Sequence, residues 1–182
     1  MANYKLDAKD TVLVIIDLQE KLMKAMKDKD RVYKNTNLLI ETAKQLNIPI
    51  MLTEQYPKGL GATADEIKNN LPEHFYLDKV SFSACIGNLP SELEKLGRKN
   101  ILVTGSETHI CVFQTVRDLV ELGYQVQVVK DAVCSRTDEN YNSGLELMKD
   151  LGAVITNAET IVFDLLKVSG TPEFKVISPL LK

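Results

Sequence analysis

The sequence predicts an α/β fold, a three-layer α/β/α sandwich around a six-stranded parallel sheet. The first observation is the order of elements, because six short strand-like segments alternate with segments whose apolar residues recur at helical spacing. The second is "TVLVIID" (11–17), a continuous apolar run that is typical of a strand buried on both faces. The third is the lack of an internal repeat or low-complexity linker, so that 1–182 is expected to form a single domain.

The expected elements follow from local signals along the chain. Apolar residues at helical spacing mark 31–47, Pro and Ser open 89–97, and a glycine closes 109–123. The expected strands are 11–17, 48–56, 74–84 (a strand with its exit, the strand ending at Lys79), 99–105, 124–133 and 153–157. The expected helices are 31–47, 89–97, 109–123, 138–152 and 158–168. The apolar C-terminal stretch 174–182 is expected to dock on its own domain or on a neighbour.

Composition restricts the class of partner. The chain has 22 basic and 25 acidic residues, interspersed, and a formal net charge of −3, so it has neither a basic stripe for phosphates nor a polybasic membrane anchor. We therefore expect no nucleic acid and no membrane partner. No apolar run approaches the roughly 20 residues of a membrane span, and "MANYKLDAKD" has no apolar signal core. These features predict a cytoplasmic location, with an organelle left open.

The cysteines and histidines predict neither a disulfide framework nor a metal centre. Cys85, Cys111 and Cys134 stand in no CxxC or Cys/His spacing, and the chain has only two histidines, His74 and His109. The thiols are therefore expected to be reduced, and one of them can serve as a nucleophile.

Three residues at strand ends form the candidate site. With the strand order 3-2-1-4-5-6, the first and fourth strands are neighbours where the order reverses, and ligands bind at that point in open α/β sheets. Asp17 ends the first strand, Cys111 follows the fourth, and Lys79 belongs to the third. A base, a nucleophile and an orienting cation would meet there. The structural alternatives are a capping role for Asp17, an exposed Lys79 and a packed Cys111.

The position of Cys111 at a helix start favours reactivity. A helix N-terminus or a nearby cation lowers a thiol pKa, so this thiol is expected to ionise more readily than a free one. The same turn offers N–H groups without helical partners, which is a common way to build an oxyanion hole.

Four motifs give the chain a resemblance to the isochorismatase-like cysteine hydrolases, the superfamily that includes nicotinamidases, N-carbamoylsarcosine amidases and isochorismatases. They are "VLVIIDLQE", "KVSFSA", "GSETHICVFQTVRDL" and "VVKDAVCSR", and the resemblance covers nearly the whole chain. The resemblance implies a hydrolase that acts on a small amide-like molecule through a thioester. It also implies a homo-oligomer, a dimer or a tetramer.

By the same resemblance, each site residue has an implied role. Cys111 is the nucleophile, Asp17 the general base and later acid, and Lys79 stabilises the thiolate and orients the aspartate. A cis peptide bond is implied between Ser106 and Glu107, turning the N–H groups of Glu107 and Cys111 toward the substrate oxygen.

Two departures from better-known members narrow the expected chemistry. Nicotinamidases bind a metal through an Asp-x-His after the second strand, whereas 52–67 contains no histidine here. We expect no catalytic metal and no cofactor, which disfavours nicotinamide as substrate. Isochorismatases proper hydrolyse a vinyl ether by acid catalysis and usually lack the cysteine, so Cys111 argues against that chemistry. Enol-ether hydrolysis with Asp17 as the acid is the alternative activity. A non-catalytic binding or scaffold protein is the second alternative.

Residues around the three strand ends have provisional roles. Gln55, Tyr56 and Phe82 are expected to line the substrate pocket, with core packing as the alternative for the two aromatic residues. His109 lies two positions before Cys111 and does not face it on a helix, so capping, packing or an interface is expected. The resemblance also suggests ion pairs, at the surface or between subunits, for Arg117, Asp118 and Arg136.

Overall fold

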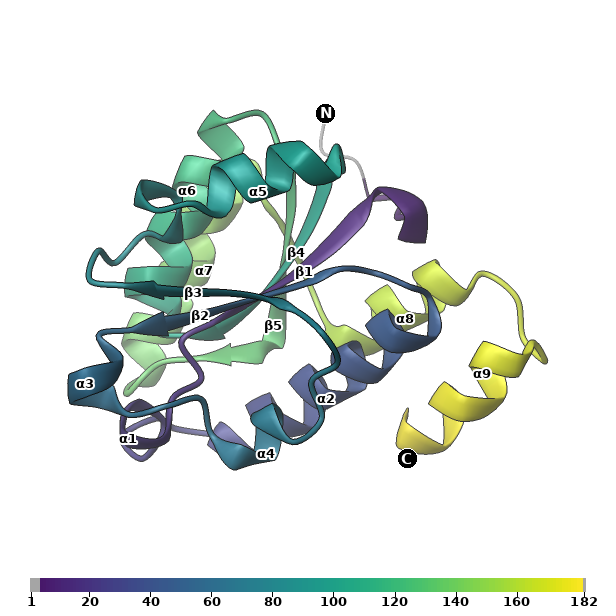
Figure 1. The fold of residues 1–182 in the computed structure, drawn as a ribbon, viewed down its shortest axis with the longest axis horizontal. Helices are drawn as coiled ribbons and strands as arrows, with labels where there is room; N and C mark the ends of the chain where they lie inside the picture. The colour runs from purple at the N-terminus through teal and green to yellow at the C-terminus, as the bar shows by residue number, and fades with distance from the viewer. Residues whose placement is uncertain (1–3, 182) are drawn as a thin grey trace.

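The computed structural model describes residues 4–181, which form an all-parallel six-stranded sheet covered by helices on both faces (Figure 1). The strand order is β3-β2-β1-β4-β5-β6. The strands are β1 (Thr11–Ile16), β2 (Ile50–Gln55), β3 (Phe75–Lys79), β4 (Asn100–Ser106), β5 (Gln125–Cys134) and β6 (Val154–Thr156). The predicted fold class and strand order are confirmed.

The helices divide into two layers. The longer ones are α2 (Lys29–Gln45), α5 (Leu89–Leu96), α6 (Phe113–Glu121), α7 (Asp138–Asp150) and α8 (Ala158–Leu166). Shorter helices, which the sequence patterns did not predict, are α1 (Glu20–Met23), α3 (Pro57–Leu60), α4 (Asp65–Lys68) and α9 (Pro172–Ile177). One face of the sheet carries α2 and α8, and the other carries α5, α6 and α7 (Figure 1). None of the helices in residues 4–181 combines the length and hydrophobicity that a bilayer crossing requires.

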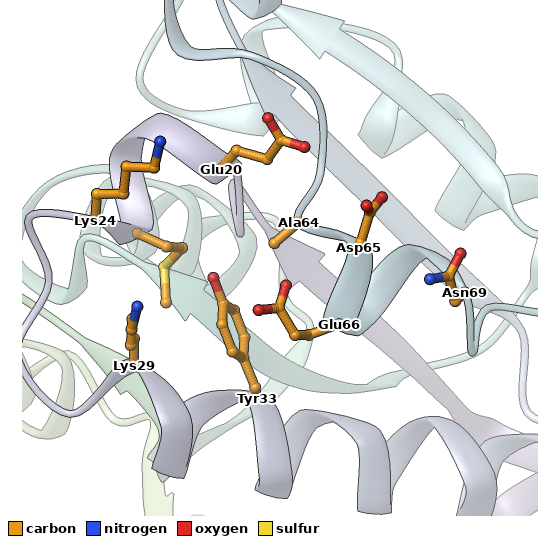
Figure 2. A pocket seen from close by; sticks show the side chains of 9 residues that line it. Glu20, Lys24, Lys29, Tyr33, Ala64, Asp65, Glu66 and Asn69 are labelled. Carbon is orange, nitrogen blue, oxygen red and sulfur yellow. The ribbon is translucent and has the colours of Figure 1, made fainter.

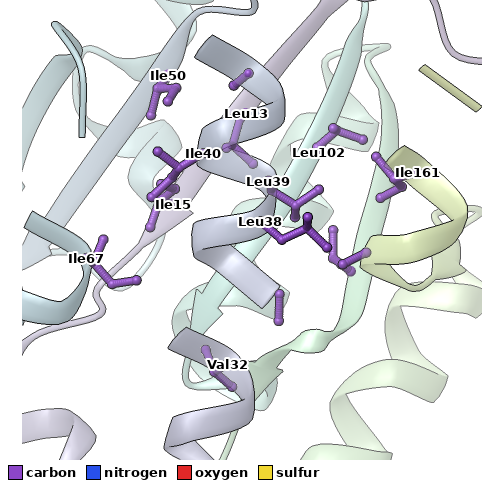
Figure 3. Packing of buried hydrophobic residues seen from close by; sticks show 14 of the residues in the cluster. Leu13, Ile15, Val32, Leu38, Leu39, Ile40, Ile50, Ile67, Leu102 and Ile161 are labelled. Carbon is purple, nitrogen blue, oxygen red and sulfur yellow. The ribbon is translucent and has the colours of Figure 1, made fainter. Parts of the chain in front are cut away.

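The position of strand β1 between two cores explains why its sequence is continuously apolar. Leu13 and Ile15 point into the core under α2 and α8, where they pack with Leu39 and Ile161 (Figure 3). Val14 and the other alternate residues of β1 point into the second core, under α5, α6 and α7. Because side chains alternate across a strand, burial on both faces requires an apolar residue at every position.

The C-terminal stretch packs on its own domain. Helix α9 contacts α2, and Ile177 is fully buried in the same core as Leu39. This settles the expectation for the described part of 174–182 in favour of docking within the domain.

The third strand ends where it was expected and the helix after β4 does not begin as expected. Strand β3 ends at Lys79, whose carbonyl accepts the N–H of Tyr56 at 2.8 Å, and Val80 in the exit segment is exposed. The helix expected from residue 109 begins instead with a π-helical turn, Thr108–Val112, before α6. Apolar residues extend from α6 into this turn, so a hydrophobic pattern alone overestimates the length of the regular helix.

Gly105 allows β1 and β4 to approach each other closely where the sheet order reverses. Its φ is +130°, and a Cβ at this position would lie 2.1 Å from the carbonyl oxygen of Ile16.

Gly105→Ala is therefore expected to lower the free energy of unfolding by about 3 kcal/mol or more, measured by urea denaturation. The control is Gly97→Ala, where φ is +65° and no atom lies within 4 Å of the added Cβ; its expected cost is about 1 kcal/mol. Equal losses would contradict the close approach.

Candidate active site

The fold brings Asp17, Lys79 and Cys111 together at the carboxyl ends of the strands. Asp17 follows β1, Lys79 is the last residue of β3, and Cys111 lies in the π-helical turn after β4. Since β2 lies between β1 and β3, the Lys79 side chain must reach across the end of β2. Its Nζ lies 2.6 Å from Oδ2 of Asp17.

Lys79 is buried rather than exposed. Besides Asp17, its ammonium group donates to Oε1 of Gln55 at 2.8 Å and to the carbonyl of Phe82 at 3.1 Å. Only 6% of the residue is accessible to solvent. A buried ammonium is stable only when it is paired and hydrogen-bonded, and these partners meet that requirement.

The Asp17 carboxylate is held on both oxygens. While Oδ2 accepts from Lys79, Oδ1 accepts from the hydroxyl of Thr53 at 2.7 Å, and the residue is fully buried. The backbone of Asp17 has a positive φ of 52°, and its carbonyl accepts the Ser106 hydroxyl at 2.9 Å. These contacts fix the orientation of the carboxylate. Thr53 was missed from the sequence, although a polar residue near the end of a buried strand was a usable signal.

The Cys111 thiol does not have the lowered pKa that its position suggested. Burial, the negative charge of Asp17 and a hydrogen bond to Asp17 together raise its pKa to about 12, and only Lys79 opposes the increase. The thiol packs among the apolar residues under α6, at 5% exposure. The resting group is therefore a neutral thiol next to a carboxylate, and a base has to remove its proton.

The loop before Cys111 has an unusual backbone. The peptide bond between Ser106 and Glu107 is cis. The Glu107 carbonyl accepts the N–H groups of Ile110 at 3.0 Å and Val112 at 3.2 Å, and neither bond uses the N–H of Cys111 between them.

Side-chain contacts anchor this loop from outside. The carboxylate of Glu107 pairs with Nε of Arg136 at 2.9 Å, which places Arg136 in an ion pair as the sequence suggested. Arg117 and Asp118, the other two residues for which the resemblance suggested ion pairs, pair with each other at 2.8 Å. Helix α7 approaches the loop closely at Gly144, where a Cβ would lie 2.8 Å from the Thr108 carbonyl.

The three predicted pocket residues lie beside Lys79 but differ in exposure. Gln55 binds Lys79 directly, and its Nε2 donates to the Val80 carbonyl at 2.8 Å. Tyr56 and Phe82 are each 53% exposed, so the core-packing alternative for them is wrong. Their contact with a substrate stays a prediction.

His109 is not paired with Cys111. Its Nδ1 lies 3.1 Å from the Ser135 hydroxyl oxygen, and burial lowers its pKa. The ring thus makes a contact within its own domain, and its role in capping, packing or an interface stays a prediction. Cys85 is partly buried and Cys134 is buried, and burial raises the pKa of each thiol to about 12. Within residues 4–181, no group of three or more His, Cys, Asp or Glu side chains could hold a metal ion.

Fold and site together define a class of protein: a doubly wound α/β protein with a buried acid, lysine and cysteine at the reversal of strand order. Residues 11–160 match the model of the isochorismatase domain. The chain belongs to this family, the isochorismatase-like hydrolases.

Relatives agree with this assignment over most of the chain. The secreted isochorismatase effector Isc1 of Phytophthora sojae is 40% identical over 177 residues, covering 94% of this chain and 84% of the relative. The structure of the MAR1 ribonuclease from Caenorhabditis elegans aligns with a TM-score of 0.91 at 36% identity, covering 97% and 92% of the two chains. The YcaC gene product of Escherichia coli, described as an octameric hydrolase of unknown specificity, shares the fold with a TM-score of 0.85 at 24% identity, over 92% and 85% of the chains.

Proposed function

We propose that this protein is a metal-independent cysteine hydrolase that cleaves a small amide-like substrate at its C–N bond, through a thioester on Cys111. The observation that carries the proposal is the fully buried carboxylate of Asp17, held by Lys79 and Thr53 and hydrogen-bonded to the thiol. A nucleophile beside an oriented base is the arrangement that covalent catalysis requires.

The first half of the reaction forms the thioester. Asp17 takes the proton of Cys111, and the sulfur attacks the carbonyl carbon, whose oxygen becomes negatively charged. The N–H groups of Glu107 and Cys111 bind this oxyanion in the proposed mechanism. The C–N bond then breaks, and the amine leaves with the proton from Asp17. The raised pKa of the thiol fits this order of events, because the sulfur becomes reactive only as its proton moves to Asp17.

The second half releases the acid. Asp17 takes a proton from water, the resulting hydroxide attacks the thioester carbon, and the tetrahedral species expels the Cys111 thiolate. The thiolate regains the proton from Asp17, which restores the starting state. Lys79 remains positively charged throughout and stabilises the negative charge as it moves between the aspartate and the sulfur.

Three other functions would require different residues or contacts. Enol-ether hydrolysis would use Asp17 as an acid and leave Cys111 without a role. A non-catalytic family member would not need the buried pair. Ribonuclease activity, named for the C. elegans protein, would require contacts to phosphates. The interspersed charges and net charge of −3 favour a small molecule instead.

The assembly and location remain proposals. We propose a homo-oligomer, a dimer or tetramer, and the octameric YcaC is a precedent within the shared fold. The cytoplasmic location stays a prediction from the sequence.

A substrate panel tests the proposed activity. Small amides, carbamoyl compounds, enol ethers and an RNA oligonucleotide are assayed with the wild type, Cys111→Ala and the control Cys85→Ala, which removes a thiol outside the site. We expect an amide or carbamoyl compound to be hydrolysed by the wild type and by Cys85→Ala only. Enol-ether or RNA cleavage that persists in Cys111→Ala would overturn the proposal.

A further inference from the structure

A cavity lies between α1, the beginning of α2, and α4, and none of the three catalytic candidates lines it (Figure 2). Its volume is about 450 Å³, which falls within the roughly 300 to 1,000 Å³ typical of small-molecule sites. We call it the Tyr33 cavity, and the residues used below are Glu20, Lys24, Lys29, Tyr33, Asp65 and Glu66.

Charges of opposite sign occupy different parts of the Tyr33 cavity. Lys24 and Lys29 lie on one side, while Asp65 and Glu66, both from α4, lie on the other (Figure 2). No ion pair formed within residues 4–181 includes any of these four side chains. Their charges are therefore free to bind a molecule that carries both signs.

Tyr33 supplies a hydrogen-bond donor inside the cavity. Its ring rises from α2 between the two charged sides, with the hydroxyl pointing into the cavity (Figure 2). The residue is 8% exposed, and none of the hydrogen bonds within residues 4–181 involves its hydroxyl. The hydroxyl oxygen is open to the cavity rather than enclosed by protein, so it can donate its proton to a molecule bound there. Burial, followed by the charge of Glu66, raises the pKa of Tyr33 to about 12, so the hydroxyl keeps its proton as a donor.

The walls of the cavity are fixed to each other by backbone hydrogen bonds. The N–H of Glu20 donates to the Ala62 carbonyl at 3.0 Å, and the N–H of Ala64 donates to the Leu18 carbonyl at 2.9 Å. These bonds tie α1 to the segment that leads into α4. A cavity formed in this way requires little ordering when a ligand binds.

We propose that the Tyr33 cavity binds a small zwitterion of about dipeptide size, a ligand distinct from the substrate of the proposed hydrolase. The ammonium end would face Asp65 and Glu66, and the carboxylate end would face Lys24 and Lys29. Tyr33 would donate its hydroxyl proton to an oxygen of the ligand between them. Charge-assisted hydrogen bonds of this kind are about twice as strong as neutral ones.

Three related probes test both ends of the ligand. Glycylglycine carries both charges, N-acetylglycylglycine only the negative one, and glycylglycinamide only the positive one. Binding is measured by titration with detection of backbone amide chemical shifts, which also locates the bound probe. We expect glycylglycine to shift signals around Tyr33 and Glu66. The dissociation constant of each singly charged probe should be higher by about tenfold or more.

Two conservative variants and one control complete the experiment. Tyr33→Phe should weaken glycylglycine binding about fivefold or more, whereas Tyr124→Phe, which removes a hydroxyl outside the cavity, should not. Glu66→Gln should weaken glycylglycine and glycylglycinamide but not N-acetylglycylglycine. The proposal is overturned if glycylglycine gives no saturable shifts up to about 10 mM, if all three probes bind alike, or if Tyr33→Phe binds as tightly as the wild type.

Discussion

Cys111→Ala is expected to lower kcat for the best amide substrate by roughly 10⁴- to 10⁶-fold, as loss of the nucleophile does in other covalent hydrolases. The physical reason is that the Cys111 sulfur forms the covalent intermediate in the proposed mechanism, and alanine has no atom that can replace it. Cys111 lies beside the fully buried carboxylate, while Cys85 is hydrogen-bonded to the Thr115 carbonyl elsewhere and Cys134 packs in the other core.

Steady-state kinetics with the purified variants check this expectation. Cys85→Ala should keep activity within about twofold of the wild type, because its thiol is outside the reacting atoms. Urea denaturation of each variant separates a catalytic loss from unfolding. A folded Cys111→Ala protein that retained more than about a tenth of the wild-type kcat would contradict nucleophilic catalysis by the thiol.

Lys79→Met is expected to cost about 3 to 5 kcal/mol of folding stability and to abolish activity. The substitution leaves the Asp17 carboxylate buried with two uncharged side-chain partners, the Thr53 hydroxyl and the Cys111 thiol, and a buried charge without its counter-ion is strongly unfavourable. The long, unbranched methionine fills most of the volume of the lysine stem, so the loss reports mainly on charge.

A surface pair and a double variant serve as controls. Lys95→Met removes the ammonium from the pair with Glu92, in which the lysine side chain is 70% exposed, and should cost less than about 1 kcal/mol. Asp17→Asn combined with Lys79→Met removes both charges and should recover most of the stability without recovering activity. If the double variant were no more stable than Lys79→Met, the buried charge would not be the cause.

The elements that could be predicted from the sequence are those whose residue types report both how deeply the element is buried and where it begins or ends. "TVLVIID" predicted β1 because a strand buried on both faces must be apolar throughout, and Gly123 marked the end of the helix that contains α6. The order of strands then brought Asp17 and Cys111 to the same edge by topology alone.

Features that depend on three-dimensional contacts were missed or wrong. Thr53 holds Asp17 from a strand 36 positions away in sequence, and although a polar residue near the end of a buried strand was a signal, the sequence did not reveal its partner. The pKa of Cys111 was expected to fall, but burial and the negative charge of Asp17 outweigh Lys79 and raise it. The strength of desolvation depends on packing from several elements, which a position at a helix start does not reveal.

The same limit applies to the Tyr33 cavity. The short helices α1 and α4 have only four residues each, too few for a periodic pattern to be recognised. Their side chains meet Tyr33 only because the chain folds back from β2. A cavity built from such segments is visible in the structure but cannot be predicted from the pattern of apolar residues along the sequence.

The most direct test of the proposed mechanism is rapid quenching of the wild type during turnover of its best amide substrate, followed by intact-protein and peptide mass spectrometry. The proposed mechanism predicts a mass increase equal to the acyl part of the substrate, located on the peptide that contains Cys111 and removed by hydroxylamine. Turnover during which Cys111 never carries the acyl group, with hydroxylamine trapping no acyl product, would contradict the thioester.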